Sequence, residues 1–372
     1  MIRNIHFRGS LENSRIQFEK NKKGHVAFIG GSITQMNGYR PMVSEDLKKR
    51  FPNTKFTFTN AGISSTCSTS GAFRLEEHVL KTGPVDLFFI EFAVNDDQDA
   101  GLARRECMRG MEGIIRRARQ HNPNMDIVIT HFVNPGMLKK LQSGKEPLTM
   151  ESHEKVAEHY GVPTIHLAQE VADQIKAETM TWKKFGGTHP KPPGNRLCAD
   201  LIQEMLESAW KGELVADAGK PHPIPGKVID SGHYGNGRFI DIKSAKLAKG
   251  WTVSVPEWGK LKGGKRGQFT NIPILWTEKA DSELTLEFEG RAVGAYILAG
   301  PDAGIVAASV DDGPAEKHQL FHRFSRGLHY PRTVMFETDL KPGKHVLKLQ
   351  MTGEKSKQSI GNAIRIMQFV AN

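Results

Sequence analysis

The chain has 372 residues, of which 38% are hydrophobic and 25% charged, and its formal net charge at pH 7 is +10. Two domains are expected at this length, and the composition is typical of a soluble globular protein. No apolar stretch approaches the roughly 20 residues of a membrane-spanning helix, and residues 1–23 lack the apolar core of a secretory signal. We therefore expect no membrane partner, and a cytoplasmic protein unless a signal was removed from a secreted or periplasmic one.

The positive charge raises the question of nucleic-acid binding. Basic residues are mostly scattered, and the densest cluster, at 260–266, is not interleaved with the aromatic residues that a single-strand platform requires. We expect no nucleic-acid partner, although an acidic polysaccharide stays open. The three cysteines, Cys67, Cys107 and Cys198, are too few and too widely spaced for a disulfide framework, and we expect them to be buried apolar residues.

The first 210 residues alternate between strand-like and helix-like segments, which predicts a parallel sheet with flanking crossover helices. The predicted strands are 26–29, 55–60, 85–92, 125–132 and 162–165, and the predicted helices are 41–51, 71–81, 102–120, 151–160 and 193–210. Ser32, Gly62 and Asn95 each fall just beyond a strand. In open α/β sheets this carboxyl edge is where ligands bind.

After residue 210 the helical periodicity disappears and proline and glycine become frequent, which predicts a linker over 213–228. Short alternating runs separated by turn residues follow, at 284–288, 295–298, 334–337 and 345–349. They predict an antiparallel β-sandwich of jelly-roll type over 229–372. The expected domains are therefore 1–212 and 229–372.

Four short segments contain the candidate site residues. They are Gly-Gly-Ser-Ile-Thr at 30–34, Asn-Ala-Gly at 60–62, Ala-Val-Asn-Asp at 93–96 and Gly-Thr-His-Pro at 187–190. In order and position they resemble the sequence blocks of the SGNH (GDSL) hydrolases, a family of serine esterases and acylhydrolases with a flavodoxin-like α/β fold. The segments 299–304, 326–329 and 363–366 resemble the β-sandwich attached to some bacterial members that act on carbohydrate.

By this resemblance Ser32 is the nucleophile, His189 is the general acid and base, and Gly62 and Asn95 belong to the oxyanion hole together with the backbone N–H of Ser32. The residue types suit these tasks. A serine hydroxyl needs a neighbouring base, histidine titrates closest to neutral pH, and glycine N–H and asparagine amide groups donate without carrying a charge. Each also has a structural alternative, such as a helix N-cap for Ser32 or a turn for Asn95.

The chain departs from the family pattern at two positions. Gly31 stands where the family commonly has aspartate, and Gly186 stands where it has the acid that orients the histidine. Three alternatives follow: a backbone carbonyl orients His189 in a Ser–His dyad, Asp96 or Asp97 supplies the acid of a triad, or the family chemistry has been lost. Arg74, His131 and Trp182 are weaker site candidates, for which packing or surface roles are at least as plausible.

We therefore expect a serine ester hydrolase that removes short acyl groups, most plausibly acetyl, from a carbohydrate or another small acylated substrate. One alternative is a glycan-binding protein with a degenerate esterase site, and another is a glycosidase that uses carboxylates near Asn95, such as Glu91 and Asp96. No cofactor and no metal are expected, because the chain lacks His-Glu-x-x-His spacing and the glycine-rich loops of nucleotide sites. The oligomeric state is left open.

Overall fold

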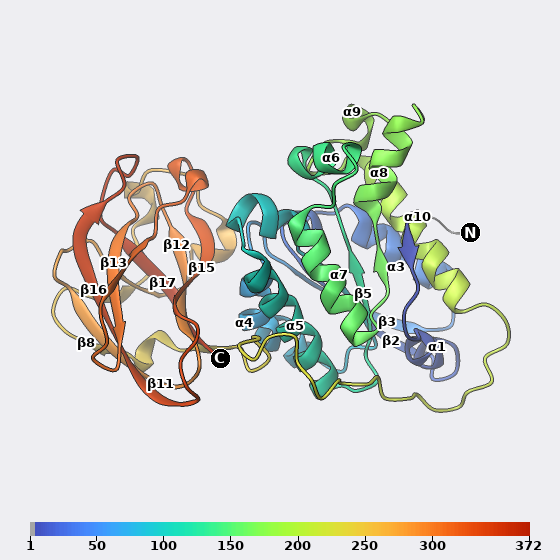
Figure 1. Ribbon diagram of the computed structural model, residues 1–372, viewed down its shortest axis with the longest axis horizontal. Helices are drawn as coiled ribbons and strands as arrows, with labels where there is room; N and C mark the ends of the chain where they lie inside the picture. Colours follow the sequence, from blue (N-terminus) through green and yellow to red (C-terminus); the bar gives the residue numbers. More distant parts are fainter. Residues whose placement is uncertain (1–3) are drawn as a thin grey trace. The chain divides into compact units, whose positions relative to one another are not determined.

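In the computed structural model, which describes residues 4–372, the first unit of the chain (Met1–Gly235) is built around a six-stranded sheet (Figure 1). The strand order is β1-β6-β5-β4-β2-β3, and every pairing is parallel except that of β1 with β6. The strands are β1 (Ile5–His6), β2 (Lys23–Gly30), β3 (Lys55–Gly62), β4 (Leu87–Glu91), β5 (Asp126–Thr130) and β6 (Thr164–Ile165). The predicted parallel α/β architecture is confirmed.

Helices cover both faces of this sheet (Figure 1). Those described in the first unit are α1 (Glu12–Glu19), α2 (Ser32–Gln35), α3 (Tyr39–Arg50), α4 (Ser68–His78), α5 (Arg104–His121), α6 (Pro135–Gln142), α7 (Leu148–Tyr160), α8 (Leu167–Lys176), α9 (Trp182–Phe185) and α10 (Pro192–Ala209). The segment η2 (Asn95–Ala100) is π-helical. Among the described helices, none is long and apolar enough to cross a lipid bilayer. All three cysteines are buried, as predicted.

The burial of the central strand β2 explains why its sequence predicts a strand. Residues 26–29 are fully buried, because β3 and β4 pair on either side of β2 and helices pack above and below it. A strand covered on both faces reads as a continuous apolar run. Strand β1 and helices α1, α2, α6, α8 and α9 were not predicted. β1 has only two residues, too few to show a period.

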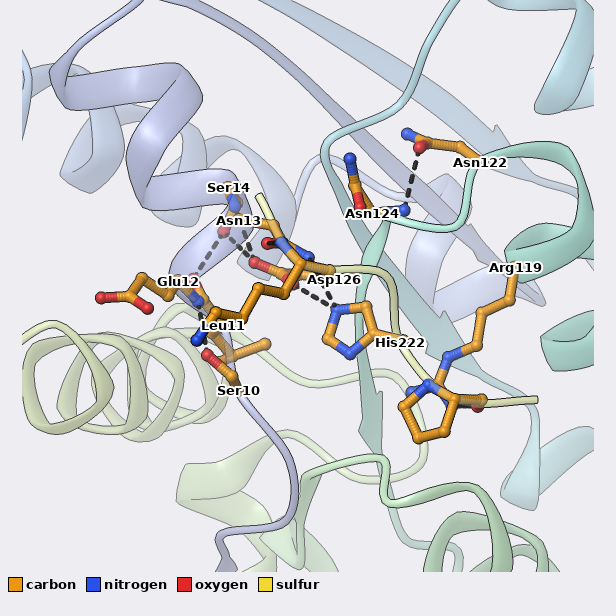
Figure 2. A network of polar contacts seen from close by, with 12 residues as sticks. Ser10, Leu11, Glu12, Asn13, Ser14, Arg119, Asn122, Asn124, Asp126 and His222 are labelled. Carbon is orange, nitrogen blue, oxygen red and sulfur yellow. Dashed lines mark hydrogen bonds and ion pairs between the residues drawn. The ribbon is translucent and has the colours of Figure 1, made fainter. Parts of the chain in front are cut away.

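The segment 213–228, which we predicted as a linker, lacks helices and strands and groups with the first unit, which extends to Gly235. Figure 2 shows His222 beside Asp126, whose carboxylate accepts a hydrogen bond from His222 Nε2 at 2.7 Å and from the backbone and side chain of Ser14, both at 2.7 Å. Arg119 donates to the carbonyl of Pro223 at 2.9 Å. Proline and glycine prevent regular structure here, but the segment still bonds to strand β5 and helix α5 through side chains and carbonyls.

The second unit (Asn236–Asn372) consists of two antiparallel sheets packed face to face. One sheet has the order β15-β12-β17-β10-β9, with β7 beside β17, and the other has the order β14-β13-β16-β11-β8. The strands are β7 (Arg238–Ile240), β8 (Lys246–Leu247), β9 (Thr252–Ser254), β10 (Ile274–Thr277), β11 (Glu283–Gly290), β12 (Val293–Ala299), β13 (Gly304–Val310), β14 (Glu316–Gln319), β15 (Tyr330–Glu337), β16 (Gly343–Lys355) and β17 (Ile364–Ala371). The predicted antiparallel β-sandwich is confirmed, and each of the four predicted runs is part of a strand.

Candidate active site

Ser32 is the first residue of α2, and only Gly31 separates it from the carboxyl end of β2. The preceding Gly31 is buried, and a Cβ atom added to it would overlap the side-chain amide of Asn95. Asn95 begins η2, just beyond β4, which is the neighbour of β2. The glycine at position 31 therefore allows an asparagine side chain to lie directly against the backbone beside the serine.

His189 reaches this serine from a distant part of the chain. It lies in the loop between α9 and α10, and its Nε2 is 2.8 Å from Ser32 Oγ. Ser32 is half-buried and His189 is exposed, so a substrate can approach the pair from solvent. The distance is that of a hydrogen bond through which a base can accept a hydroxyl proton. The two groups therefore meet the first geometric requirement of nucleophilic catalysis.

Arg74, on α4, holds together the two strand ends that carry the site. Its guanidinium is fully buried and donates to the carbonyl of Gly30 at 3.0 Å and to the carbonyl of Ala61 at 2.6 Å. These carbonyls belong to the last residue of β2 and the penultimate residue of β3. Arg74 thus does not line the surface of the site, but fixes the spacing of the backbone on which Ser32 and Gly62 stand.

Gly62 ends β3 opposite Gly30 and packs against α2, where a Cβ would overlap the backbone nitrogen of Gln35. Its backbone N–H donates to the side-chain oxygen of Asn60 at 3.0 Å. A substrate oxyanion would have to replace that oxygen to use the Gly62 donor. Asn60 is exposed, so its side chain can turn away into water.

Asn95 is 1% exposed, and its Nδ2 donates to Asp99 Oδ2 at 2.6 Å, one π-helical turn further along the chain. A carboxylate accepts hydrogen bonds only, so this contact fixes which end of the amide faces Asp99. Nδ2 carries a second hydrogen, which the contact with Asp99 does not use. Sequence reasoning missed Asp99, although its spacing of four residues from Asn95 in an acidic run is a usable signal.

Asp96 does not orient His189. It is fully buried, and its oxygens accept hydrogen bonds from the backbone N–H and the hydroxyl of Ser68, both at 2.7 Å. Oδ2 also lies 2.9 Å from His153 Nε2. Asp97 instead accepts a hydrogen bond from Asn134 at 2.8 Å. The interpretation of Asp96 as the acid of a triad is therefore wrong, because the carboxylate anchors the start of α4 and pairs with α7.

Position 186, where the family pattern has its acid, has no room for a side chain. Gly186 has φ +110°, and a Cβ there would overlap the backbone nitrogen of Lys191, which donates to the Phe185 carbonyl at 2.9 Å. In the part of the chain that the structure describes, His189 Nδ1 has no hydrogen-bond partner. Among residues 4–372, no backbone carbonyl bonds this nitrogen, so the first of the three alternatives lacks its orienting group. His189 is thus held by its loop and by Ser32.

The lack of room at Gly186 leads to a testable prediction. Introducing the family acid by Gly186→Asp should lower the free energy of unfolding by about 2 kcal/mol or more, because the left-handed backbone alone costs roughly 1–2 kcal/mol and the overlap adds to it. Esterase kcat/KM should fall. Gly187→Asp is the matched control, because Gly187 also has positive φ (+85°) but open space around its Cβ. A Gly186→Asp variant as stable as Gly187→Asp and faster than wild type would contradict this account.

Trp182, a weaker candidate, is half-buried on α9 and stacks on Phe185 with ring centroids 5.6 Å apart. This contact favours packing as its main role. His131 is fully buried and hydrogen-bonds Glu154 at 2.8 Å, as predicted for a packing histidine.

Glu91 lies beneath the serine at the end of β4 and is fully buried. Its Oε2 accepts hydrogen bonds from the backbone N–H of Gly31 at 3.4 Å and from the Thr34 hydroxyl at 3.1 Å. Burial raises the pKa of Glu91 to about 7, and the charges of Asp96 and Asp99 act in the same direction. Because Glu91 and Asp96 are both inaccessible, neither can reach a glycosidic bond, and the pair does not support the glycosidase alternative.

A raised pKa makes stability depend on pH in a definite direction. In the unfolded chain Glu91 ionises near 4.5, whereas in the folded protein its pKa is about 7, so folding free energy is lost as pH rises between these values. Glu91→Gln cannot ionise. We expect its free energy of unfolding, relative to wild type, to increase by on the order of 2 kcal/mol between pH 5 and pH 8 in denaturant titrations. The surface variant Glu204→Gln should show no such trend, and a pH-independent difference for Glu91→Gln would contradict the assignment.

The chain resembles known proteins in sequence and in fold. Residues 28–197 match the sequence model of the GDSL-like lipase/acylhydrolase family. The structure resembles that of a two-domain esterase (CEX) active on acetylated mannans, at 20% identity and TM-score 0.78, over 99% of this chain and 97% of that one. A catalytic mutant of Axe2, an acetylxylan esterase from Geobacillus stearothermophilus, matches at 18% identity and TM-score 0.39, over 52% of this chain and 96% of that one. No curated protein matches the sequence significantly.

Proposed function

Because its first unit belongs to the GDSL-like lipase/acylhydrolase family and the protein is thus a carboxylic ester hydrolase, we propose that it removes acetyl groups from a carbohydrate. In this proposal Ser32 is the nucleophile and His189 the general acid and base. The observation that carries it is the 2.8 Å contact between Ser32 Oγ and His189 Nε2 at the carboxyl edge of the sheet. Acetylated mannan is the first substrate to test, because the relative of matching two-unit fold is active on acetylated mannans.

The proposed reaction proceeds in two steps. Ser32 Oγ attacks the acetyl carbonyl carbon while His189 Nε2 accepts the hydroxyl proton. The oxyanion then faces the N–H groups of Ser32 and Gly62 and the second hydrogen of Asn95 Nδ2. Collapse of this intermediate releases the sugar alcohol, which takes the proton from His189. Water, deprotonated by the same imidazole, hydrolyses the acetyl-enzyme and returns the hydroxyl to Ser32.

A dyad without an orienting acid is chemically sufficient, since the acid of a triad holds the imidazole and stabilises its charge but does not accept the proton. The loop of His189 supplies part of that orientation. Gly186 N–H donates to the Trp182 carbonyl at 3.0 Å, and the Asn195 side chain donates to the Pro190 carbonyl at 2.7 Å. These bonds fix the backbone on both sides of the imidazole.

The test is acetate release from acetylated mannan, acetylated xylan and an aryl acetate by the full chain and by Ser32→Ala. We expect wild type to release acetate from mannan and Ser32→Ala to release none above background. The open Nδ1 of His189 favours one second candidate, a glycan-binding protein with a degenerate site. Binding of a manno-oligosaccharide without acetate release from any of the three substrates would support that candidate and overturn the esterase proposal.

A further inference from the structure

A cluster of imidazoles around one carboxylate lies beside the edge strands β1 and β6 of the first sheet. His6 comes from β1, His166 follows β6 directly, and Glu154 is on α7. His131, after β5, completes the group. In the strand order, β4 and β5 separate β6 from β2, so this cluster is distinct from the candidate active site.

Each carboxylate oxygen of Glu154 lies close to two side-chain nitrogen atoms. His131 Nε2 lies 2.8 Å from Oε1 and Arg8 Nη2 lies 2.8 Å from Oε2, both in hydrogen-bond geometry. His166 Nε2 lies 3.0 Å from Oε1, and His6 Nδ1 lies 3.2 Å from Oε2. A carboxylate has about four acceptor positions. His131, Arg8 and His6 are in hydrogen-bond geometry with the carboxylate, whereas His166 Nε2 lies beside Oε1 without a hydrogen bond.

Of the two remaining contacts, only that of His6 meets hydrogen-bond geometry. His6 Nδ1 lies 3.2 Å from Glu154 Oε2 and 3.4 Å from Arg8 Nη2, but one nitrogen cannot donate to the carboxylate and accept from the guanidinium at the same time. His166 Nε2 is buried and has no hydrogen-bond partner despite its closeness to Glu154. Two imidazole nitrogens and a carboxylate oxygen this close together, one of them unpartnered, are arranged like ligands around a common cation.

We propose that His6, Glu154 and His166 bind a divalent transition-metal ion of the Zn²⁺ class. Their three ligand atoms all lie within 4.8 Å of one another. Two imidazoles and one carboxylate form a ligand set typical of zinc, at metal–ligand distances of about 2.0–2.2 Å, so the ligands need only a small inward movement. Hard ions such as Mg²⁺ instead prefer oxygen ligands.

The surroundings fit this assignment. The side chain of His6 is 47% exposed whereas those of Glu154 and His166 are only 13% and 10% exposed, so an ion can enter from solvent and reach a largely dry site. Arg8 and His131 orient the carboxylate from outside, as second-layer partners of metal ligands commonly do. The ion would tie the two-residue edge strand β1 to β6 and α7. No local motif reveals this set, because its members come from three separate elements.

The test uses the full chain, purified without a histidine tag, stripped with a chelator and titrated with Zn²⁺ in a calorimeter. We expect one equivalent per chain with micromolar or tighter affinity, a thermal midpoint that rises with Zn²⁺ concentration, and no comparable response to Mg²⁺. His6→Gln should bind at least tenfold more weakly. His345→Gln is the matched control, since His345 also pairs with a carboxylate, that of Asp311, but belongs to the second unit.

Because His6 is half-exposed, its variant is expected to keep the fold, and circular dichroism checks this. Glu154→Gln provides a second variant and should also bind at least tenfold more weakly. Absence of Zn²⁺ binding at 1 mM, equal affinities of wild type and His6→Gln, or equal affinities for Zn²⁺ and Mg²⁺ would each overturn the proposal. The readout is binding and stability, so it is independent of the esterase assay.

Discussion

Replacing Ser32 with alanine is expected to lower kcat for an aryl acetate by at least about 1000-fold, with little change in the free energy of unfolding. The variant keeps the donors of the oxyanion hole but removes the atom that forms the acetyl-enzyme, and loss of a nucleophile typically costs this much or more. Ser32 Oγ makes its hydrogen bond to an exposed imidazole, so truncation leaves no buried polar group unpaired. Steady-state kinetics and a denaturant titration of the same preparation measure both quantities.

Ser44→Ala is the matched control for this substitution. Its hydroxyl donates to the Arg40 carbonyl on α3 and takes no part in the site, so its kcat should match that of wild type. His189→Gln should lose a similar factor to Ser32→Ala, and the double variant should be no slower than the worse single variant, because the two residues act as one unit. Two independent losses that multiply would contradict a dyad.

Replacing Asn95 with alanine is expected to lower kcat by roughly 100- to 1000-fold while KM changes little. An oxyanion donor acts on charge that develops only in the transition state, and removal of one such donor usually costs this much. The Asn95 amide lies against Gly31 and has one hydrogen committed to Asp99 at 2.6 Å. Kinetics on an aryl acetate test the prediction, and a kcat within a few-fold of wild type would exclude Asn95 from the oxyanion hole.

Asp99→Asn tests how the amide of Asn95 is held. An asparagine at 99 can offer either its oxygen or its nitrogen, so the orientation of Asn95 is no longer enforced. We expect a loss of about tenfold in kcat, and no additional loss when Asp99→Asn is combined with Asn95→Ala. Asp97→Asn is the control, because Asp97 contacts Asn134 instead of Asn95. A full loss in the Asp97 variant would instead indicate a general collapse of η2.

Much of the fold followed from local patterns. Strand β2 is apolar throughout 26–29 because both of its faces are covered, and glycine or asparagine follows several strands at the carboxyl edge. Predicted helices such as 41–51 and 102–120 correspond to α3 and α5. The sequence could not predict strand β1 or the contacts of segment 213–235 with the first unit. Neither segment has a hydrophobic period, and both are held by contacts with residues far away in the chain.

The sequence by itself predicted the parallel sheet, the β-sandwich, the family and the candidate site residues, since burial periods and strand-end motifs are local properties of the chain. Only the tertiary structure decided the partners. Asp96 bonds to Ser68 and His153, and Asn95 bonds to Asp99. A side chain at position 186 would overlap its neighbours. His6, Glu154 and His166 lie close together in space. Hydrogen bonds and ligand sets depend on distances in space between residues that can be more than 100 positions apart, and these distances exist only after the chain has folded.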